Sequence, residues 1–359
     1  MNSINQKYST IKRLGIDLSK NTLQMHGEDE KSRKVLERGF SRRSVLSFTA
    51  NLSPCTIAME ACGSSHYWGR EFMKQGHTVQ LLPAQYVKPF VKSHKNDRID
   101  AEAICEASAR PNKRLVPVKT IEQHDIQSLH RVRQYICKNR TALANQIRGL
   151  LGEYGIVIPE GITHVFSEMP SVLEDAENHL SNLIREVLKE QFEELKHIDE
   201  RFQAITKKIE NVAASHPLCR RLMTLEGFGP LTATALYGAV GNGSQFKKGR
   251  HMSAWLGVVP KQYSTGGRSR LGRISKHGNC YIRSLMAGGA RAVVQYADKK
   301  EDRLSKWICQ IKGKKGYNVA VIALVNKNMR VAWAVLTKGE EYDITHQEQL
   351  AKRYEKAAA

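Results

Sequence analysis

Short apolar runs separated by turn-forming residues predict a small α/β domain over residues 11–120. Such runs, bounded by Gly, Pro, Asn and Ser, are typical of strands, and longer amphipathic stretches are typical of helices. We expect strands at 11–18, 22–26, 34–39, 54–59 and 77–82, and helices at 41–51, 64–75 and from residue 96 onward. The first three strands follow one another directly, and helices separate the later ones.

Helical periodicity replaces this pattern after residue 120. Residues 121–155 read as one long helix that ends near Gly152 or Gly155. Within residues 167–213, apolar residues recur at alternating spacings of four and three, as in a heptad seam that Gln191 interrupts. The seam consists of Ile184, Leu188, Leu195, Ile198, Phe202, Ile205, Ile209 and Val212. It can pack within its own chain, but its length favours a coiled coil that sets the oligomeric state.

These changes divide the chain into four parts. We expect an α/β domain over 1–120, a helical coiled-coil connector over 121–215, a mainly helical domain over 216–300 and a helical extension over 301–359. The extension contains an apolar helix but no recognisable motif. No run approaches the roughly 18 apolar residues of a membrane span, and the polar N-terminus is not a signal peptide. The fold class is therefore α/β plus α, with no membrane partner.

The charge of the chain predicts a polyanionic partner. Fifty-six Lys and Arg against 35 Asp and Glu give a net charge of +21, which favours nucleic acid over a membrane surface. The segment Gly227–Ala297 holds ten Lys or Arg and no acid. The long helix carries Arg131, Arg133, Lys138, Arg140 and Arg148, where a solvated face and a phosphate contact are equally expected. Seven scattered cysteines without C-x-x-C indicate reduced thiols in a cytoplasm.

Four carboxylates occupy positions where a metal site can form. Asp17 ends the first strand, Glu60 ends the fourth, and Asp97 and Asp100 lie one turn apart on a helix that Asn96 can cap. Each alone can be a solvated acid. Together they favour a site for two Mg²⁺ ions, which would activate an attacking oxygen and stabilise the leaving one. Three strands followed by alternating helix and strand are the order of a ribonuclease-H-like fold.

Glycine-rich motifs mark the acid-free segment. Gly227 and Gly229 lie between two expected helices, as in a helix-hairpin-helix element, where backbone N–H groups can approach a phosphate; a plain turn is equally expected. Ser264 and Ser275 lie in two basic loops. A serine there usually forms a turn, but it can be a nucleophile beside groups that hold a phosphate. The basic residues expected to bind nucleic acid are Arg268, Arg270, Arg273 and Lys276.

In this order, the motifs resemble those of the DEDD transposases of bacterial insertion sequences, the "IS one-ten" family and its "IS eleven-eleven" subgroup. They are Gly15-Ile16-Asp17, Met59-Glu60, Asn96-Asp97-x-x-Asp100, Gly227-Phe228-Gly229-Pro230, Ser264-Thr265-Gly266-Gly267 and Gly272-Arg273-Ile274-Ser275-Lys276-x-Gly278-Asn279. The resemblance covers residues 11–300. It implies a RuvC-like N-terminal domain, a coiled-coil connector and a C-terminal transposase domain with a catalytic serine. It further implies a bridge-RNA-guided recombinase that acts on donor and target double-stranded DNA. It also implies a covalent serine–DNA intermediate and a dimer or tetramer in a bacterial cytoplasm.

Carried over to this chain, the resemblance makes Asp17, Glu60, Asp97 and Asp100 the metal-binding acids and Ser264 the nucleophile. Because Thr265 separates Ser264 from Gly266, whereas many relatives place serine directly before glycine, Thr265 and Ser275 stay open as alternatives. We expect the acids and the serine to act in one composite active site. A Holliday-junction nuclease that uses hydrolysis, and an inactive nucleic-acid-binding relative, are the other functions considered. The basic serine loop argues against the first and the intact acids against the second.

Overall fold

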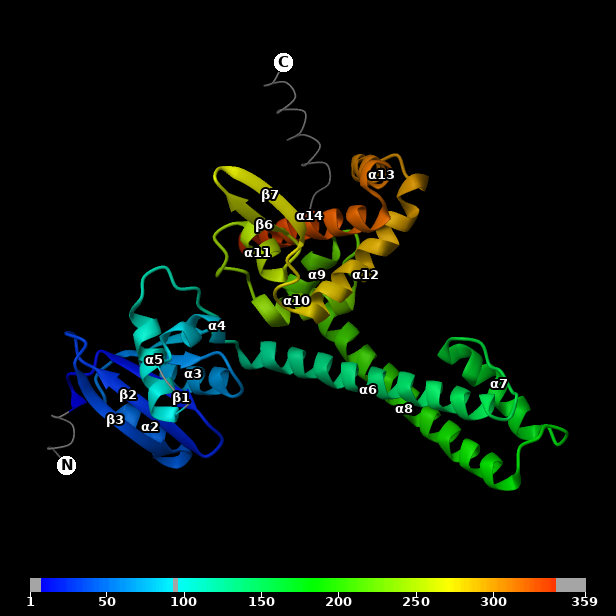
Figure 1. Ribbon diagram of the computed structural model, residues 1–359, viewed down its shortest axis with the longest axis horizontal. Helices are drawn as coiled ribbons and strands as arrows, with labels where there is room; N and C mark the ends of the chain where they lie inside the picture. Colours follow the sequence, from blue (N-terminus) through cyan, green and yellow to red (C-terminus); the bar gives the residue numbers. More distant parts are fainter. Residues whose placement is uncertain (1–7, 93–95, 340–359) are drawn as a thin grey trace, which may run out of the picture. The chain divides into compact units, whose positions relative to one another are not determined.

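The computed structural model describes residues 8–92 and 96–339. The chain divides between Ile121 and Glu122 into two compact units (Figure 1). The first unit is mixed α/β and the second is mostly helical, which confirms the predicted succession of fold classes. The finer division of the second unit into connector, helical domain and extension stays a prediction. Residues 340–359 of the predicted extension lie outside the described residues.

A five-stranded mixed sheet with the order β3-β2-β1-β4-β5 organises the first unit. Its strands are β1 (Arg13–Leu18), β2 (Thr22–Glu28), β3 (Lys34–Ser41), β4 (Thr56–Glu60) and β5 (Thr78–Leu82). The first three are antiparallel neighbours, whereas β4 pairs parallel to β1 and β5 parallel to β4. All five expected strands are present. The α/β class is confirmed, and the closer ribonuclease-H-like assignment stays a prediction.

The helices of this unit begin where the sequence predicts their caps. They are α2 (Arg42–Ala50), α3 (Ser65–Lys74), α4 (Ala84–Val87), the 3₁₀ helix η1 (Lys88–Phe90) and α5 (Asp97–Ala109). The Ser41 side chain accepts a hydrogen bond from the Ser44 N–H, and the Asn96 side chain accepts one from the Arg98 N–H. These bonds satisfy N–H groups that a helix terminus otherwise leaves without partners. The Asn96 cap therefore fixes where the Asp97–Asp100 turn begins.

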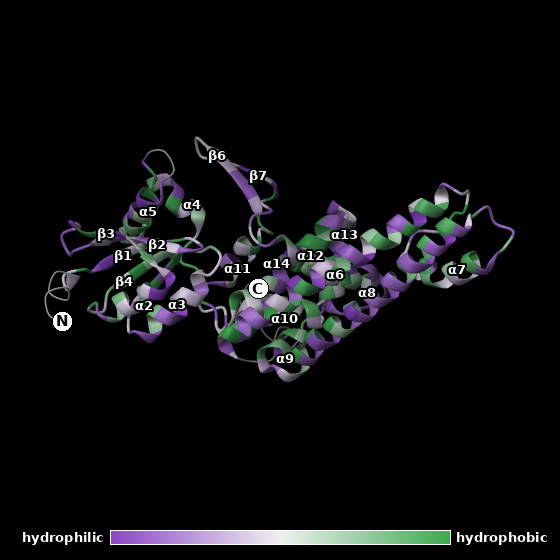
Figure 2. Cartoon of the chain, turned by 90° about the horizontal axis from the view of Figure 1, so that it is seen from below, coloured by the Kyte–Doolittle hydropathy of each residue, from purple (hydrophilic) through white to green (hydrophobic). Residues whose placement is uncertain are grey.

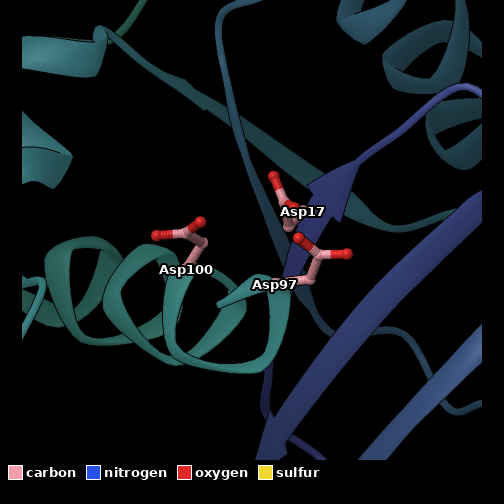
Figure 3. Close-up of side chains that lie close together, drawn as sticks. All are labelled: Asp17, Asp97 and Asp100. Atoms are coloured by element: carbon pink, nitrogen blue, oxygen red, sulfur yellow. The ribbon is translucent and has the colours of Figure 1, made fainter. Parts of the chain in front are cut away.

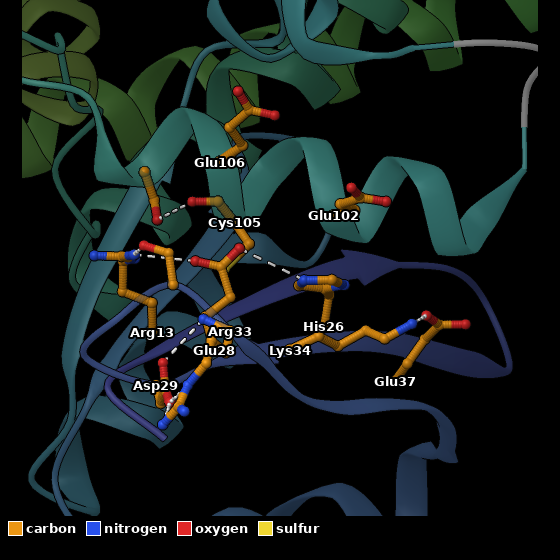
Figure 4. A network of polar contacts seen from close by, with 12 residues as sticks. Arg13, His26, Glu28, Asp29, Arg33, Lys34, Glu37, Glu102, Cys105 and Glu106 are labelled. Carbon is orange, nitrogen blue, oxygen red and sulfur yellow. Dashed lines mark hydrogen bonds and ion pairs between the residues drawn. The ribbon is translucent and has the colours of Figure 1, made fainter. Parts of the chain in front are cut away.

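Helix α5 packs against β1 and β2. Its apolar residues Ala103, Ile104 and Ala107 are buried with Ala58 and Leu82 of the sheet. Figure 4 shows the polar network beside this contact, in which Arg13 donates to the Glu28 carboxylate across β1 and β2 at 3.0 Å. Cys105 lies among these groups, and burial raises the pKa of its thiol to about 12. These contacts hold the middle of α5 against the sheet.

The second unit consists of helices and one strand pair. It contains α6 (Ile121–Gly152), α7 (Ile162–Glu174), α8 (Asn182–Ser215), α9 (Pro217–Met223), α10 (Pro230–Val240), α11 (Gly249–Leu256), β6 (Pro260–Thr265), β7 (Arg268–Ile274), α12 (Cys280–Tyr296), η2 (Ala297–Lys299), α13 (Arg303–Lys315) and α14 (Tyr317–Lys338). The long helix predicted from residue 121 is confirmed, including its end at Gly152.

The predicted heptad seam has a partner within its own chain. Leu188 and Leu195 of α8 are buried in one cluster with Leu143 and Ile147 of α6. Phe192, not Gln191, lies on the buried line, so the predicted polar interruption is wrong. The α8 seam therefore packs on α6 to form a helical hairpin. Whether it also sets a dimer or tetramer stays a prediction.

Polar contacts hold the same two helices together. Arg140 pairs with Asp199, and Arg133 donates to Thr206 at 2.9 Å. Both guanidinium groups also lie over the Phe202 ring, at 4.6 Å for Arg133 and 4.9 Å for Arg140. Two of the basic residues that could have bound phosphates are thus engaged inside the hairpin.

The segment expected to be a serine loop forms a β-hairpin instead. β6 and β7 pair antiparallel around the turn Gly266-Gly267, where both residues have positive φ angles of 55° and 74°. A two-residue turn with positive φ angles matches the right-handed twist of the two strands that it joins, and glycine adopts this conformation without strain. The region is mainly helical, as predicted, but the strand pair in place of a loop was not foreseen, although a Gly-Gly pair between strand-forming residues favours a hairpin. Figure 2 shows its mostly hydrophilic surface.

Helix α14 lies in the core of the second unit. It is the one helix among the described residues that is long and apolar enough, by length and composition alone, to cross a membrane. It is not an uninterrupted apolar run, because Asn326, Lys327 and Arg330 lie within it. Half of the stretch is buried, and Leu324, Val325, Met329 and Ala332 are packed in the main hydrophobic cluster. That packing accounts for its hydrophobicity.

Candidate metal centre and nucleic-acid interface

Three aspartates from two elements converge at the end of β1. Asp17 lies in β1, one residue before its end, and Asp97 and Asp100 lie in the first turn of α5. One carboxylate oxygen from each lies within 4.8 Å of the others. Figure 3 shows the three side chains gathered where the strand meets the helix. Asp97 is exposed, and the other two are half-buried. Oxygen atoms at this spacing suit a hard divalent cation.

Glu60 lies on the neighbouring strand, outside this group of three. Ile16 pairs with Met59 in the parallel β1–β4 ladder, so Asp17 and Glu60 follow at the same edge of the sheet. The Glu60 charge contributes to the raised pKa of Asp17, and both acids contribute to the raised pKa of the Cys62 thiol. The structure thus brings three of the four predicted acids together and places the fourth beside them.

The electrostatics of the cluster favour a cation. Burial, followed by repulsion from Asp100, Asp97 and Glu60, raises the pKa of Asp17 to about 6. The main influence in the other direction is a hydrogen bond from the Leu18 backbone. A carboxylate kept partly protonated by its neighbours is stabilised in its ionised form when a positive charge arrives. The donor set and the excess negative charge therefore fit a divalent metal.

Gly15 allows α5 to approach β1 this closely. A Cβ atom at position 15 would overlap the carbonyl oxygen of Ala101 and lie 2.7 Å from the backbone nitrogen of Cys105. Both are backbone atoms of α5, so a side chain here can be accommodated only by moving the helix. Sequence reasoning noted Gly15 only as part of a motif, because close backbone contact leaves no other trace in the sequence.

We expect Gly15→Ala to separate the aspartates. Overpacking of this kind costs about 1–3 kcal/mol of folding stability, and displacement of α5 should also weaken divalent-metal binding. Urea unfolding and metal titration measure the two effects. Gly39→Ala is the matched control on the same sheet, because its Cβ would meet only side-chain atoms of Gln24 and Thr22 at 3.1 Å. Equal behaviour of the two variants would contradict the packing argument.

The raised pKa of Asp17 predicts a pH dependence of stability without metal. In the folded state Asp17 has a pKa of about 6, whereas an unperturbed Asp carboxyl has a pKa of 3.8. The stabilisation from protonated Asp17 is therefore complete below pH 4 and is lost as pH rises through 6. Because the Asp17 side chain is partly exposed, we expect the free energy of unfolding to fall by only about 1–2 kcal/mol over this pH range.

Asp17→Asn should remove this dependence. In EDTA the variant should be more stable than the wild-type protein at pH 7.5 and equally stable near pH 4, as measured by urea unfolding. Adding Mg²⁺ should stabilise the wild-type protein and leave the variant unchanged. A wild-type curve that parallels the variant from pH 4 to 7.5 would refute the assignment.

Ser264 lies on the exposed surface of the β6–β7 hairpin. It pairs with Ser269 across the ladder, and its hydroxyl accepts a hydrogen bond from the Gln262 side chain at 2.8 Å. Arg268, Arg270 and Arg273 lie on the facing strand and are also exposed. The hairpin therefore presents the predicted serine together with three of the predicted cations. Thr265 is the next residue of β6 and is equally exposed.

Ser275 lies at the base of the hairpin. Its N–H donates to the Val259 carbonyl at 2.8 Å, and its side chain is half-buried. The neighbouring motif residues have structural roles. A Cβ atom at Gly278 would overlap the Trp255 carbonyl, and Asn279 caps α12 by accepting from the N–H groups of Tyr281 and Ile282. Lys276 is exposed and has a positive φ of 55°.

The Gly227 turn is packed against another helix. Gly227 has a φ of 85°, and a Cβ atom there would lie 3.1 Å from the backbone of Gly289 in α12. Gly229 precedes α10 in an extended conformation, with nothing within 4 Å of an added Cβ atom. The turn between two helices is confirmed. Close packing explains Gly227, and phosphate contact by either glycine stays a prediction.

Comparison with known proteins identifies the family. One family model, described as "Transposase IS116/IS110/IS902 family", matches residues 219–305, and a second, described as "Transposase" and named for the DEDD transposases of IS110, matches residues 14–156. A "Probable family 20 transposase" of Pseudomonas aeruginosa is 43% identical over 329 residues, covering 91% of this chain and 97% of the relative. The chain belongs to the IS110/IS116 family of DEDD transposases.

Two further relatives carry the names of insertion sequences. The "Transposase for insertion sequence element IS1111A" of Coxiella burnetii is 40% identical, over 92% of this chain and 91% of the relative. The "Transposase for insertion sequence element IS1328" of Yersinia enterocolitica is 37% identical, over 91% of this chain and 97% of the relative. This transposase is therefore an insertion-sequence enzyme that binds DNA and cleaves or transfers its strands. Its DEDD family typically uses a divalent metal, for which the aspartate cluster is the candidate site.

Proposed function

We propose that this transposase is a recombinase that cuts and rejoins donor and target DNA strands through a serine–DNA intermediate. The aspartate cluster at the end of β1 is the observation that carries the proposal, because phosphodiester transfer needs charge neutralisation at the phosphate. The exposed hairpin supports it by carrying Ser264 and several basic residues on one element. A ribonuclease-H-like assignment of the first unit also belongs to this proposal, since its sheet places Asp17 and Glu60 at one edge.

Asp17, Asp97 and Asp100 would hold the divalent ions, with Glu60 beside them. We propose that the site binds two Mg²⁺ ions, because carboxylate oxygens are the protein ligands that Mg²⁺ prefers. When bound, the ions supply positive charge that lowers the pKa of the attacking hydroxyl and offsets the charge that develops on the phosphate. The Asn96 cap and Gly15 fix the positions of the aspartates before any substrate arrives.

Ser264 would supply the attacking oxygen. Its Oγ forms a bond to phosphorus while the bond from phosphorus to the DNA oxygen breaks, and that oxygen leaves as a hydroxyl after gaining a proton. The serine proton passes to a base. Attack by a hydroxyl of a second strand then reverses the step and restores the serine, so no external energy source is needed. Arg268, Arg270, Arg273 and Lys276 would hold the phosphates during both steps.

A structure-specific nuclease that uses hydrolysis is the second candidate. One observation favours it: the described contact of the Ser264 hydroxyl is with the Gln262 amide, which is a hydrogen-bond donor here and not a base. In that reading the aspartates activate water, and the hairpin serves only to bind DNA. The two candidates share the metal cluster and differ in whether a protein–DNA bond forms.

The proposal has three further parts. A structured bridge RNA guides the enzyme, the active assembly is a dimer or tetramer, and the enzyme acts in the bacterial cytoplasm. The net charge of +21 supports two nucleic-acid partners at once. We expect RNA transcribed from the DNA flanking the gene to bind the purified protein and to be required for joining two plasmids that carry donor and target sites. Changing the pairing segment of that RNA should redirect the target. Joining at the original rate without RNA would refute guidance.

A further inference from the structure

A groove of about 1750 Å³ lies in the second unit, lined by the β6–β7 hairpin, α11 and the C-terminal helices α13 and α14. Figure 1 shows where these elements lie in the second unit. One wall is a single face of α14, on which Val319, Ile322, Asn326 and Arg330 recur at helical spacing. The facing wall includes the Leu271–Ile274 part of β7. No sequence motif marks α13 or α14, although they supply more than half of the lining.

The charged residues of the groove are all cationic. They are Lys248, Arg250, Arg273, Lys276, Lys315, Lys327 and Arg330. Within residues 8–92 and 96–339, none of the seven is ion-paired with a carboxylate. A concave surface with charge of one sign concentrates the electrostatic field and attracts a polyanion. The neighbouring Lys300 and Lys312, by contrast, are paired with Glu226 and Asp298.

Lys327 and Trp307 meet inside the groove. The Lys327 ammonium lies 5.1 Å from the centroid of the Trp307 ring. Burial, followed by the charges of Arg303 and Arg330, lowers the pKa of Lys327. An aromatic face offsets only part of the cost of such a half-buried cation. A phosphate in the groove would offset the remainder.

The floor of the groove is apolar and aromatic. Trp307, Ile322 and Val331 line it, and Trp333 is held in place by its indole N–H, which donates to the Phe246 carbonyl at 2.8 Å. The outside of a duplex presents phosphates and sugars, for which an apolar floor offers no partner. Unpaired nucleotides expose the faces of their bases, which stack on aromatic side chains while the backbone follows the cations.

We propose that this groove binds a segment of unpaired nucleic acid, with its phosphates along Lys315, Lys327 and Arg330 and its bases against Trp307 and the apolar face of α14. The α14 wall from Val319 to Ala334 spans about 22 Å, which accommodates several nucleotides. The inference rests on the proposed function insofar as strand exchange, or a guide RNA, supplies unpaired segments. It assigns the C-terminal helices a role in holding a strand apart from its complement.

The test compares two pairs of exposed cations by fluorescence anisotropy with the full-length protein and a labelled twelve-nucleotide thymidine oligomer. Lys315→Gln/Arg330→Gln removes two cations from the groove. Lys306→Gln/Lys314→Gln removes two exposed cations of α13 that do not line it. We expect the groove pair to weaken binding about tenfold and to lower the salt slope by about 1.4, which corresponds to two lost single-strand phosphate contacts. The control pair should stay within about twofold of the wild-type protein.

Two further arms decide what the groove recognises. A blunt duplex should bind the Lys315→Gln/Arg330→Gln variant as tightly as it binds the wild-type protein. The Trp307→Leu variant should bind the oligomer more weakly, with the same dependence of affinity on salt concentration as the wild-type protein. A uridine oligomer distinguishes RNA from DNA as the source of the strand. If the double variant loses as much affinity for it as for the thymidine oligomer, the groove binds RNA as well as DNA; if its affinity for the uridine oligomer is unchanged, the groove binds DNA alone. Equal losses in both double variants, or equal losses with duplex and oligomer, would overturn the proposal. Because these assays need no cleavage, they succeed or fail independently of whether Ser264 forms an adduct.

Discussion

We expect Asp100→Asn to lose nearly all DNA strand cleavage and joining while its DNA binding stays close to that of the wild-type protein. The substitution keeps the shape of the side chain and the backbone N–H bond from residue 100 to the Asn96 carbonyl. It removes one of the three carboxylate oxygens that lie within 4.8 Å of one another. A neutral amide is a weaker ligand for a hard cation, so we expect cleavage to fall by at least about a hundredfold.

Glu106→Gln is the matched control for this prediction. Glu106 lies on the same helix and pairs with Arg110 on its exposed side, so the variant loses the same charge away from the cluster. Cleavage of a labelled DNA substrate at several Mg²⁺ concentrations measures both variants. High Mg²⁺ should restore part of the Asp100→Asn activity, whereas Glu106→Gln should need no restoration. Normal recombination by Asp100→Asn would show that the site is misassigned.

The N-terminal unit was predictable because its signals are local. Alternation of apolar and polar residues marks each strand, and Ser41 and Asn96 mark helix starts through bonds to N–H groups two and three residues later. The order of elements alone predicts that Asp17 lies near Asp97 and Asp100, because α5 packs against β1 in a fold of this order. The position of Glu60 relative to the three depends on side-chain placement, which no pattern specifies.

The second unit was harder to predict because its structure depends on distant contacts. A heptad line is the same whether its partner is α6 or another copy of the chain, and only the structure shows Leu188 against α6 residues. The Gly266-Gly267 pair indicates a turn, but the exposed strands β6 and β7 lack the alternating apolar residues that would predict a hairpin. The groove on α14 has no motif because its lining comes from five elements, and none of them carries a distinctive pattern by itself.

Ser264→Ala separates the two enzyme readings. An alcohol attacks a phosphodiester at neutral pH only when its proton is removed and the phosphate charge is offset. The described partner of the Ser264 hydroxyl is the Gln262 amide, which offers no base, so the activating groups must come from outside the hairpin. The predicted composite site assigns that role to the aspartate cluster. We therefore expect wild-type protein with labelled DNA and Mg²⁺ to form a covalent adduct that survives denaturing electrophoresis. Ser264→Ala should form none, and neither should Asp100→Asn.

The hairpin itself provides the control. Ser269 pairs with Ser264 across the ladder and is equally exposed, so Ser269→Ala changes the same surface without touching the proposed nucleophile. That variant should form the adduct at the wild-type level. Loss of the adduct only in Thr265→Ala or Ser275→Ala would transfer the role to that residue, and peptide mapping of the labelled adduct would locate the bond. DNA cleavage with no adduct in any of these proteins would leave the hydrolytic nuclease, in which the aspartates direct water to the phosphate and the hairpin serves only to bind DNA.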